Sequence, residues 1–527
     1  MCLAMIHSSI LLTSLNPYIL KQPDIKCQQN ERLVPCFEED VCTSHQKYVF
    51  DNHDTRSIVY EWKLICDYKF YQEIAPFLLA LGLLIGFIQF GKSGERNGRR
   101  ISMIVALVCS CSAEFVLFCS ASPWFFDIVI LLLGIGLGGC LVLPWVWVCE
   151  VVCPQRRYMF LGFLALAWAA GEGIACGVSY SFFTWRPLVL SSLASGLLSM
   201  AILARYMKES PRYWAVNLYR YIKARAIFQK IAESNRVIMF EDQLQGESLS
   251  QYGETSGVAG GNSERSIERG GSMDASSMDN SQFAVPFEYL GANNSPDERE
   301  HELQQERGQH CSYVHLCKLS SIRWKNLRLS VVSLLLGLFI GSSSIYEVMS
   351  EYKESYLRCS GLVFGLCIYS LFSRFTYIRW STVVIAGIDM ILVSVMYLHQ
   401  AIIGIAQGLG YMLIGCVIIQ VLEAMPTPLR CVGVSWYGAI MTVGFVIGSW
   451  VIPTFIEVLP GYATAIILLH ALPLILLNKT HNRLQDFIEE LINISSPIDL
   501  SPQIQPPPKI SHVKNSSSFR KLDEEDS

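Results

Sequence analysis

Four acidic residues stand inside long apolar runs of this chain, where they are joined by essentially no basic residue: Glu114, Glu172, Glu347 and Asp389. If such a run crosses a membrane, an ionisable side chain there costs at least about 2.5–3.5 kcal/mol, so it is a candidate for a functional role. Each of these acids could contact a bound solute, or could simply pair with a neighbouring helix.

Aromatic residues accompany the acids in the same runs. Aromatic faces attract quaternary ammonium groups by cation–π contact, worth about 0.5–2 kcal/mol each. The simpler alternative is that most of them face lipid or form interfacial belts. The candidates for a solute site are Trp168, Tyr180, Tyr346, Trp436 and Tyr437.

Other chemistry finds little support in the sequence. The segment 86–93 matches the Walker A pattern, but its central residues belong to an apolar run rather than to a strand and loop. Zinc-protease and serine-hydrolase motifs are absent, as are clustered metal ligands. We therefore expect no enzyme activity, no ATP, no cofactor and no metal.

Composition places these runs in a membrane. Hydrophobic residues make up 51% of the 527 residues and charged residues only 16%, with a mean hydropathy of +0.34. Soluble domains carry about 25% charged residues. The net charge of −4 also argues against a nucleic-acid partner, which usually requires a basic surface. The chain is predicted to be an all-α membrane protein in contact with the lipid bilayer.

Twelve segments are candidates for crossing the membrane, which requires about 17–25 residues each. The first of the two weaker segments could instead be a signal peptide, but it lacks a charged start and a typical cleavage site, so we expect a retained helix, either complete or truncated at its N-terminal end. The clear segments are 74–90, 101–121, 125–148, 158–183, 187–204, 327–345, 381–398, 401–422, 432–452 and 462–477, and the weaker ones are 5–20 and 357–375.

Charge in the connecting loops predicts the orientation. The loop after the second segment carries four basic residues and that after the fourth carries two, whereas the loops after the third and ninth carry none. Because basic residues favour the cytosolic side, both termini are predicted to be cytosolic. All four glycosylation sequons, at Asn293, Asn478, Asn493 and Asn515, then face the cytosol, and no N-glycan is expected.

The predicted topology divides the chain into six parts. Four cysteines in the extracellular part, Cys27, Cys36, Cys42 and Cys66, allow two disulfides in three connectivities. The parts are a first helix (1–20), an extracellular loop (21–69), the rest of an N-terminal six-helix bundle (70–205), a cytosolic loop with amphipathic helices to about 240 and then disorder (206–325), a C-terminal six-helix bundle (326–478) and a disordered cytosolic tail (479–527).

The two halves share a local motif. Glu150, Pro154 and Arg156 end the fourth segment, and Glu423, Pro426 and Arg430 end the tenth, at the equivalent place. This repetition indicates duplicated halves. An acid and an arginine so placed could form a cytosolic salt bridge that makes or breaks as the halves move.

A longer motif joins the second and third segments. The run Gly-Lys-Ser-Gly-Glu-Arg-Asn-Gly-Arg-Arg at 91–100 resembles the signature of the major facilitator superfamily. Four shorter motifs narrow the resemblance to the solute-carrier family of organic cation, anion and carnitine transporters. They are Glu61-Trp62, Trp185-Arg186, Glu209-Ser-Pro-Arg212 and the stretch 423–433. Residues expected to take part in the conformational change are Gly91, Glu95, Arg96, Gly98, Arg99, Arg100, Glu150, Arg156, Glu209, Arg212, Glu423 and Arg430.

The resemblance implies the major facilitator fold of two pseudo-symmetric six-helix bundles, and a plasma-membrane carrier of small organic ions that works by alternating access. In that superfamily the fifth and seventh helices line the cavity, which favours Glu172 and Glu347 over the other acids. The positions where relatives carry charged selectors are Phe364 and Thr442 here. With two acids near the cavity, a cation or zwitterion is favoured over an anion. The oligomeric state stays open.

Two alternatives remain beside a carrier of organic ions. The cytosolic turn after the eighth segment, at 373–379, lacks the second Gly-Arg-Arg signature, as would suit a scaffold or sensor that no longer transports. A sugar-type facilitator would carry several Gln and Asn in the seventh and tenth segments, where Gln407 and Gln420 are few.

Overall fold

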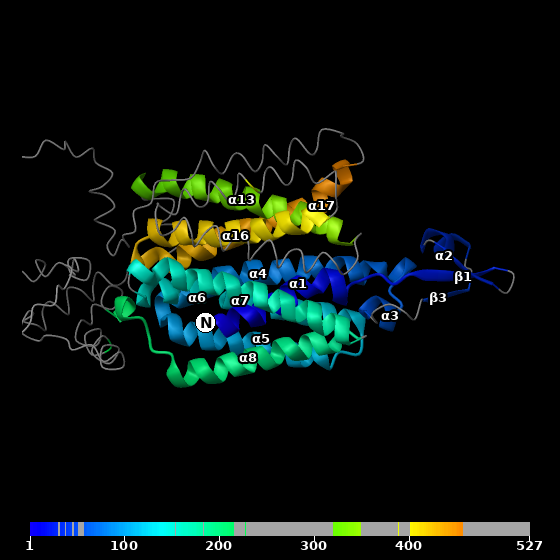
Figure 1. The fold of residues 1–527 in the computed structure, drawn as a ribbon, viewed down its shortest axis with the longest axis horizontal. Coiled ribbons are helices and arrows are strands. Elements are labelled where there is room, and N and C mark those ends of the chain that lie inside the picture. The colour runs from blue at the N-terminus through cyan, green and yellow to red at the C-terminus, as the bar shows by residue number, and fades with distance from the viewer. Residues whose placement is uncertain are drawn as a thin grey trace, which may run out of the picture.

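Figure 1 shows the computed structural model of the chain, an elongated bundle whose helices run along its long axis. Six helices in the described part are long and apolar enough to cross a membrane. The structure describes residues 1–29, 32–36, 38–44, 47–50, 57–152, 154–182, 184–214, 320–348 and 401–456, with single positions at 227 and 388.

The first half supplies six long or apolar helices, which begin and end within a few residues of the predicted segments. Proline is the first residue of α6 and the second of α8, where its missing N–H is no loss. Helix α1 continues into a π-helical turn, Leu15–Ile19. The helices are α1 (Cys2–Ser14), α4 (Lys69–Asn97), α5 (Arg99–Phe118), α6 (Pro123–Val151), α7 (Pro154–Ser181) and α8 (Arg186–Tyr206).

Three helices of the second half lie alongside the first half in Figure 1. They are α13 (Ser320–Val348), α16 (Ala401–Ala424) and α17 (Arg430–Ile456), and α17 packs against both α13 and α4. The predicted segments 357–375, 381–398 and 462–477 lie outside the described residues. So do the four sequons, the tail and most of the long loop, including the expected amphipathic helices beyond Trp214.

Glycines let paired helices approach closely in both halves. A Cβ on Gly134 of α6 would lie 2.5 Å from the Leu79 carbonyl oxygen of α4, and one on Gly138 would lie 2.9 Å from the Gly86 carbonyl carbon. Such small-residue contacts are typical of membrane helix packing. Gly173 and Gly177 of α7 have the same spacing but face open space, so spacing alone does not identify a contact among the described helices.

The part predicted to be extracellular contains a small disulfide-linked sheet. Strands β1 (Ile25–Gln29), β2 (Arg32–Pro35) and β3 (Tyr48–Phe50) pair antiparallel in the order β2-β1-β3, and the sheet projects from one end of the bundle (Figure 1). Of the three possible connectivities, the structure has Cys27–Cys36 and Cys42–Cys66. The disulfides supplement an apolar core of only a few residues.

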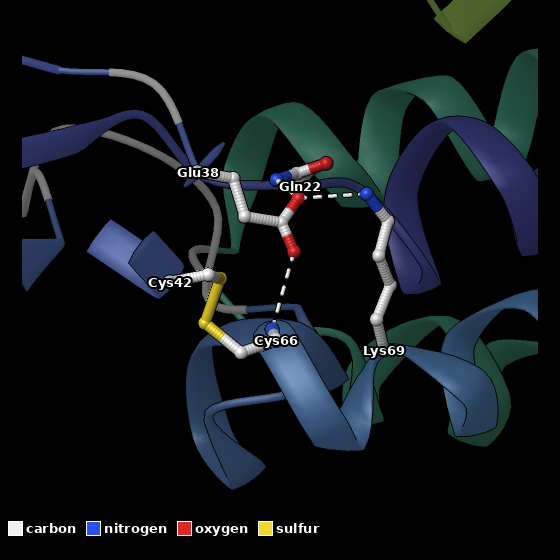
Figure 2. The surroundings of a disulfide bond; sticks show 5 residues. All are labelled: Gln22, Glu38, Cys42, Cys66 and Lys69. Atoms are coloured by element: carbon white, nitrogen blue, oxygen red, sulfur yellow. Dashed lines mark hydrogen bonds and ion pairs between the residues drawn. A yellow bond between two sulfur atoms is a disulfide. The ribbon is translucent and has the colours of Figure 1, made fainter. Parts of the chain in front are cut away.

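One carboxylate joins this sheet region to the bundle (Figure 2). Glu38, at the start of α2 (Glu38–Ser44), accepts hydrogen bonds from Lys69 Nζ and Gln22 Nε2, both at 2.8 Å, and from the Cys66 N–H at 3.3 Å. Lys69 begins α4, so this contact and the Cys42–Cys66 disulfide hold the sheet against the first long helix.

Candidate functional site

A cavity of about 240 Å³ lies between the two halves. Helices α1, α4, α6 and α7 line it from the first half, and α13, α16 and α17 from the second. Its wall is mainly apolar, as is common for small-molecule sites. Six aromatic residues take part in the wall: Phe87, Trp145, Trp168, Tyr411, Tyr437 and Phe445.

An aromatic pair spans the cavity from one half to the other. The rings of Trp168 on α7 and Tyr411 on α16 have centroids 6.1 Å apart and are tilted by 38°. The indole N–H of Trp168 is buried and has no hydrogen-bond partner within the described residues. Tyr437 instead donates to Asn326 Oδ1 at 2.6 Å. Within the described residues, the wall therefore offers aromatic faces and the indole N–H of Trp168 as a donor.

The cavity wall carries no charged side chain among the described residues. Its aliphatic hydroxyl groups are Thr13, Ser333 and Thr442. Thr13 donates to the Ser9 carbonyl at 2.7 Å and Thr442 to the Gly438 carbonyl at 2.9 Å, each within its own helix. Because both threonine hydroxyls are bonded within their own helices, aromatic faces dominate what the wall presents to a solute.

Three of the predicted solute-binding residues line the cavity: Trp168, Tyr437 and Thr442. Trp436 does not line the cavity, because adjacent residues on a helix point about 100° apart. Its indole N–H instead donates to Ser330 Oγ at 3.1 Å. Tyr180 is 75% exposed at the far end of α7, three turns from Trp168, and does not reach the cavity.

Neither of the two acids favoured as solute ligands, Glu172 and Glu347, is found in the described part of the cavity wall. Glu172 is buried on α7, one turn beyond Trp168, but does not form part of the cavity wall. Tyr346 and Glu347 fall within the bounds of α13, and their side chains lie outside the described residues.

A buried ion-pair cluster closes one end of the interface between the halves. Arg99 of α5 is fully buried, with Nη2 3.0 Å from both Glu150 Oε1 and Glu95 Oε2. Arg430 of α17 approaches the same Glu150 oxygen at 3.1 Å. We call Glu95, Arg99, Glu150 and Arg430 the inter-half cluster. It places one carboxylate between two arginines that come from opposite halves.

The cluster shows which arginines the acid of the first repeated motif contacts. Glu150 pairs with Arg430 of the other half and not with Arg156, which is exposed. The neighbouring Arg157 is buried. The Glu150 carboxylate therefore contacts one arginine of its own half, Arg99, and one of the opposite half, Arg430. Crossed pairing of this kind holds the two halves together at this end.

The signature turn is built around Gly98. Its φ of +95° favours glycine, and a side chain here would collide with Glu209. The Glu209 carboxylate accepts the backbone N–H groups of Arg99 at 2.8 Å and Arg100 at 3.1 Å, which caps the start of α5. Glu209 is therefore a positioning residue for Arg99. Of the remaining signature residues, Gly91 is buried, Arg96 is exposed and Arg212 is half-buried.

At the opposite end of the bundle, Glu61 clamps the start of α8. Its oxygens accept from Arg186 Nη1 at 2.7 Å, Arg186 Nη2 at 2.8 Å and Trp185 Nε1 at 2.8 Å. Partial burial alone would raise the pKa of Glu61, but these hydrogen bonds and the charge of Arg186 outweigh burial and hold the pKa below its usual range. The Glu61-Trp62 and Trp185-Arg186 motifs thus meet in space.

This clamp predicts a pH-dependent contribution to stability. Because the pKa of Glu61 is lowered by folding, the contribution is present above the usual carboxyl pKa and is lost as the pH falls through the lowered value. Thermal unfolding of the purified protein should therefore show a larger loss between neutral and acidic pH than the Arg186→Gln variant shows. Glu73→Gln, at an exposed acid of α4, should retain the wild-type loss. Equal losses in all three proteins would contradict the assignment.

A buried group in the first half was not expected from the sequence. His7, Cys111 and Glu114 bring potential ligand atoms within 4.8 Å of one another. The His7 ring does not suit a metal, because Nδ1 lies 3.0 Å from the Ser192 carbonyl and Nε2 lies 2.9 Å from Ser110 Oγ. Both ring nitrogens are engaged in hydrogen bonds, and the pattern is that of a polar network.

Comparison with known proteins links this geometry to a family. Residues 49–256 match the family described as "Sugar (and other) transporter". The organic cation/carnitine transporter 4 of Arabidopsis thaliana is 30% identical over 182 residues, which are 34% of each chain. Solute carrier family 22 member 4 of Mus musculus is 26% identical over 203 residues, 38% of this chain and 36% of that protein. The chain thus spans about a third of the length of the curated relatives that it matches.

Solved structures extend the likeness in fold over nearly the whole chain. The proton:xylose symporter XylE, of the major facilitator superfamily, superimposes with a TM-score of 0.56 at 13% identity. The match includes 94% of this chain and 96% of the XylE chain. The human organic anion transporter MFSD10 gives a TM-score of 0.51 at 13% identity, with 90% of this chain and 96% of that chain covered. The predicted fold class is confirmed. The chain is a multi-pass membrane protein with the major facilitator fold, and over about a third of its length it is similar to organic cation and carnitine transporters.

Proposed function

We propose that this protein carries small organic ions across the plasma membrane by alternating access, and that cations or zwitterions are preferred. The observation that carries the proposal is one cavity between two halves that are joined at one end by the inter-half cluster. A central site whose access changes as the halves rock requires such a breakable contact at one end. Nothing in this mechanism requires a cofactor or ATP.

The cavity wall favours a positively charged group with low hydration. Both halves present aromatic faces to the cavity, from Trp168, Tyr411 and Tyr437. Such faces attract a quaternary ammonium group even where the protein offers no carboxylate to pair with it. Glu172 lies buried on α7, one turn from Trp168. A solute whose only charge is negative would find no basic side chain among the described residues of the wall. The printed names of the relatives, organic cation and carnitine transporters, point the same way.

Uptake into proteoliposomes that contain the purified full chain tests the proposal. Three labelled solutes are compared: tetraethylammonium as a cation, carnitine as a zwitterion, and an aromatic carboxylate as an anion. Uptake of the first or second above protein-free liposomes supports the proposal. Uptake of the anion alone refutes the charge preference, and uptake of none of the three refutes transport of this solute class.

Replacing Trp168 with Leu is expected to weaken uptake of tetraethylammonium. The loss of one cation–π contact, about 0.5–2 kcal/mol, corresponds to an increase of about 2- to 30-fold in the half-saturating concentration. Trp124→Leu is the matched control, because Trp124 is 57% exposed at the start of α6 and does not line the cavity. An equal effect of both substitutions would show that the aromatic wall does not bind the cation.

A further inference from the structure

A second polar centre lies inside the first half, away from the cavity wall. His7 on α1 and Glu114 on α5 are both fully buried, and His7 Nδ1 lies 3.6 Å from Glu114 Oε1. Neither residue lines the cavity or belongs to the inter-half cluster. Ionisable groups inside a membrane bundle are energetically costly, which makes this pair a candidate for a functional site.

The imidazole is built to hold either one or two protons. Nδ1 faces the Ser192 carbonyl oxygen at 3.0 Å, and because that oxygen only accepts, Nδ1 carries a proton. Nε2 faces Ser110 Oγ at 2.9 Å, and this hydroxyl also lies 3.2 Å from the Leu107 carbonyl. If the hydroxyl donates to Nε2, the ring is neutral. If it donates to Leu107, its oxygen accepts from a protonated Nε2, and only a hydroxyl hydrogen has moved.

The carboxyl group of Glu114 has the same freedom. Its Oε1 accepts a hydrogen bond of 2.6 Å from Ser192 Oγ. Its Oε2 is buried and has no hydrogen-bond partner within the described residues, which leaves it room for a proton. In addition to the proton on Nδ1, the pair can hold a second proton, either on the imidazole or on the carboxyl group. The pair is neutral overall when this second proton is bound and negative when it is removed. The surrounding heavy atoms can accommodate either state as they stand.

Few other titratable groups face the pair. On α5, Cys111 lies beside Gly196 of α8, and on α6 Cys140 lies 3.9 Å from Ser110 Oγ. Helix α8 contributes serine hydroxyls and carbonyls at this point. Helix α7 packs on α1 through a hydrogen bond from Ser9 to the Trp168 carbonyl, and it carries Glu172 as its buried acid. A proton on this pair is therefore governed mainly by His7 and Glu114 themselves.

Helix α1 connects this pair to the cavity. Met5, Leu12 and Thr13 of α1 line the cavity wall, while His7 on the same helix reaches Ser110 of α5 and Ser192 of α8. We propose that His7 and Glu114 form a proton-binding site whose occupancy is coupled to solute transport through α1. The coupling rests on the proposed transport function, whereas proton binding at the pair does not.

Infrared difference spectroscopy of the full chain in lipid nanodiscs tests proton binding directly. Lowering the pH should produce a carbonyl band of a protonated, buried carboxyl group that is missing from Glu114→Gln. Asp127→Asn is the matched control, because Asp127 is a buried acid of α6 outside this network and its removal should leave the Glu114 band in place. An unchanged carboxyl spectrum in Glu114→Gln would overturn the site.

Coupling is tested in proteoliposomes that enclose a pH-sensitive dye. Tetraethylammonium has no dissociable proton, so a change of internal pH driven by its gradient must come from protons moved by the protein. We expect this signal in the wild type and in Asp127→Asn, and its loss to the level of protein-free liposomes in His7→Gln and Glu114→Gln. A wild-type signal that survives in both Gln variants would refute coupling.

A third variant keeps both ionisable groups and guards against loss of folding. Ser110→Ala removes the acceptor for a protonated Nε2, so the midpoint of the pH dependence should move to more acidic pH. An unchanged midpoint would contradict the proposed network. If tetraethylammonium is not transported at all, the transport function fails, and the infrared experiment still decides whether the pair binds a proton.

Discussion

Replacement of Glu150 with Gln should destabilise the protein by about 3 kcal/mol, because breaking a buried ion pair from one side leaves buried charge without compensation. Glu150 Oε1 lies 3.0 Å from Arg99 Nη2 and 3.1 Å from Arg430 Nη1, and all three side chains are fully buried. Arg99 keeps Glu95 at 3.0 Å, which places the expected loss at the lower end of the usual range. Unfolding of the purified protein in detergent measures it. Glu73→Gln, at an exposed acid, should change stability by less than about 0.5 kcal/mol.

The double variant Glu150→Gln/Arg430→Met separates a specific pair from general damage. Removing both charges leaves no uncompensated arginine on α17, so the double variant should be less destabilised than the sum of the two single variants. Additive losses would show that Glu150 and Arg430 do not interact across the halves.

The same substitution should open this end of the interface. Cys431 follows Arg430, is buried, and its N–H donates to Glu95 Oε1 at 2.7 Å. In Glu150→Gln, peptide-resolved maleimide labelling of Cys431 should be faster than in the wild type. Cys140, buried inside the first half beside Ser110, serves as the internal control and should keep its labelling rate. Faster labelling at both positions would indicate unfolding rather than separation of the halves.

The sequence was sufficient for the fold because the helices depend on local properties. Apolar runs, loop charges and proline positions predicted the described helices to within a few residues, and the signature at 91–100 predicted the superfamily. A turn residue such as Gly98 is also local, since its positive φ favours glycine whatever lies nearby.

The sequence could not predict which residues pair across the two halves, because this depends on which sides of the helices are packed against each other. The repeated motif predicted a salt bridge between an acid and an arginine but not its partners, and the structure brings Arg430, 280 residues away, to the Glu150 carboxylate. His7 and Glu114 meet through a similar long-range contact, from segments that the sequence treats as independent. Trp436 and Tyr437 differ by one position, and only the rotation of α17 about its axis, set by packing, decides which of them lines the cavity.

The glycines of α6 and α7 yield the second large effect. Gly138→Ala should destabilise the protein by about 1–3 kcal/mol, because its Cβ would lie 2.9 Å from the Gly86 carbonyl carbon and the Phe87 backbone nitrogen, which cannot move aside as a side chain can. Gly177→Ala on α7 meets no atom of the described residues within 4 Å and should instead stabilise by about 0.5–1 kcal/mol through better helix propensity. Thermal unfolding of both variants in the same detergent measures the difference.

The Gly138 substitution should also reduce transport, since α4 carries part of the cavity wall. Phe87 of α4 lines the cavity, and its ring packs against Gly438 of α17, where a Cβ would lie 3.1 Å from it. Moving α4 away from α6 would press Phe87 toward α17 and narrow the space for a solute. Uptake of tetraethylammonium should therefore fall in Gly138→Ala and remain at the wild-type level in Gly177→Ala. A stable Gly138→Ala protein with unchanged uptake would mean that the spacing of α4 and α6 does not set the shape of the cavity.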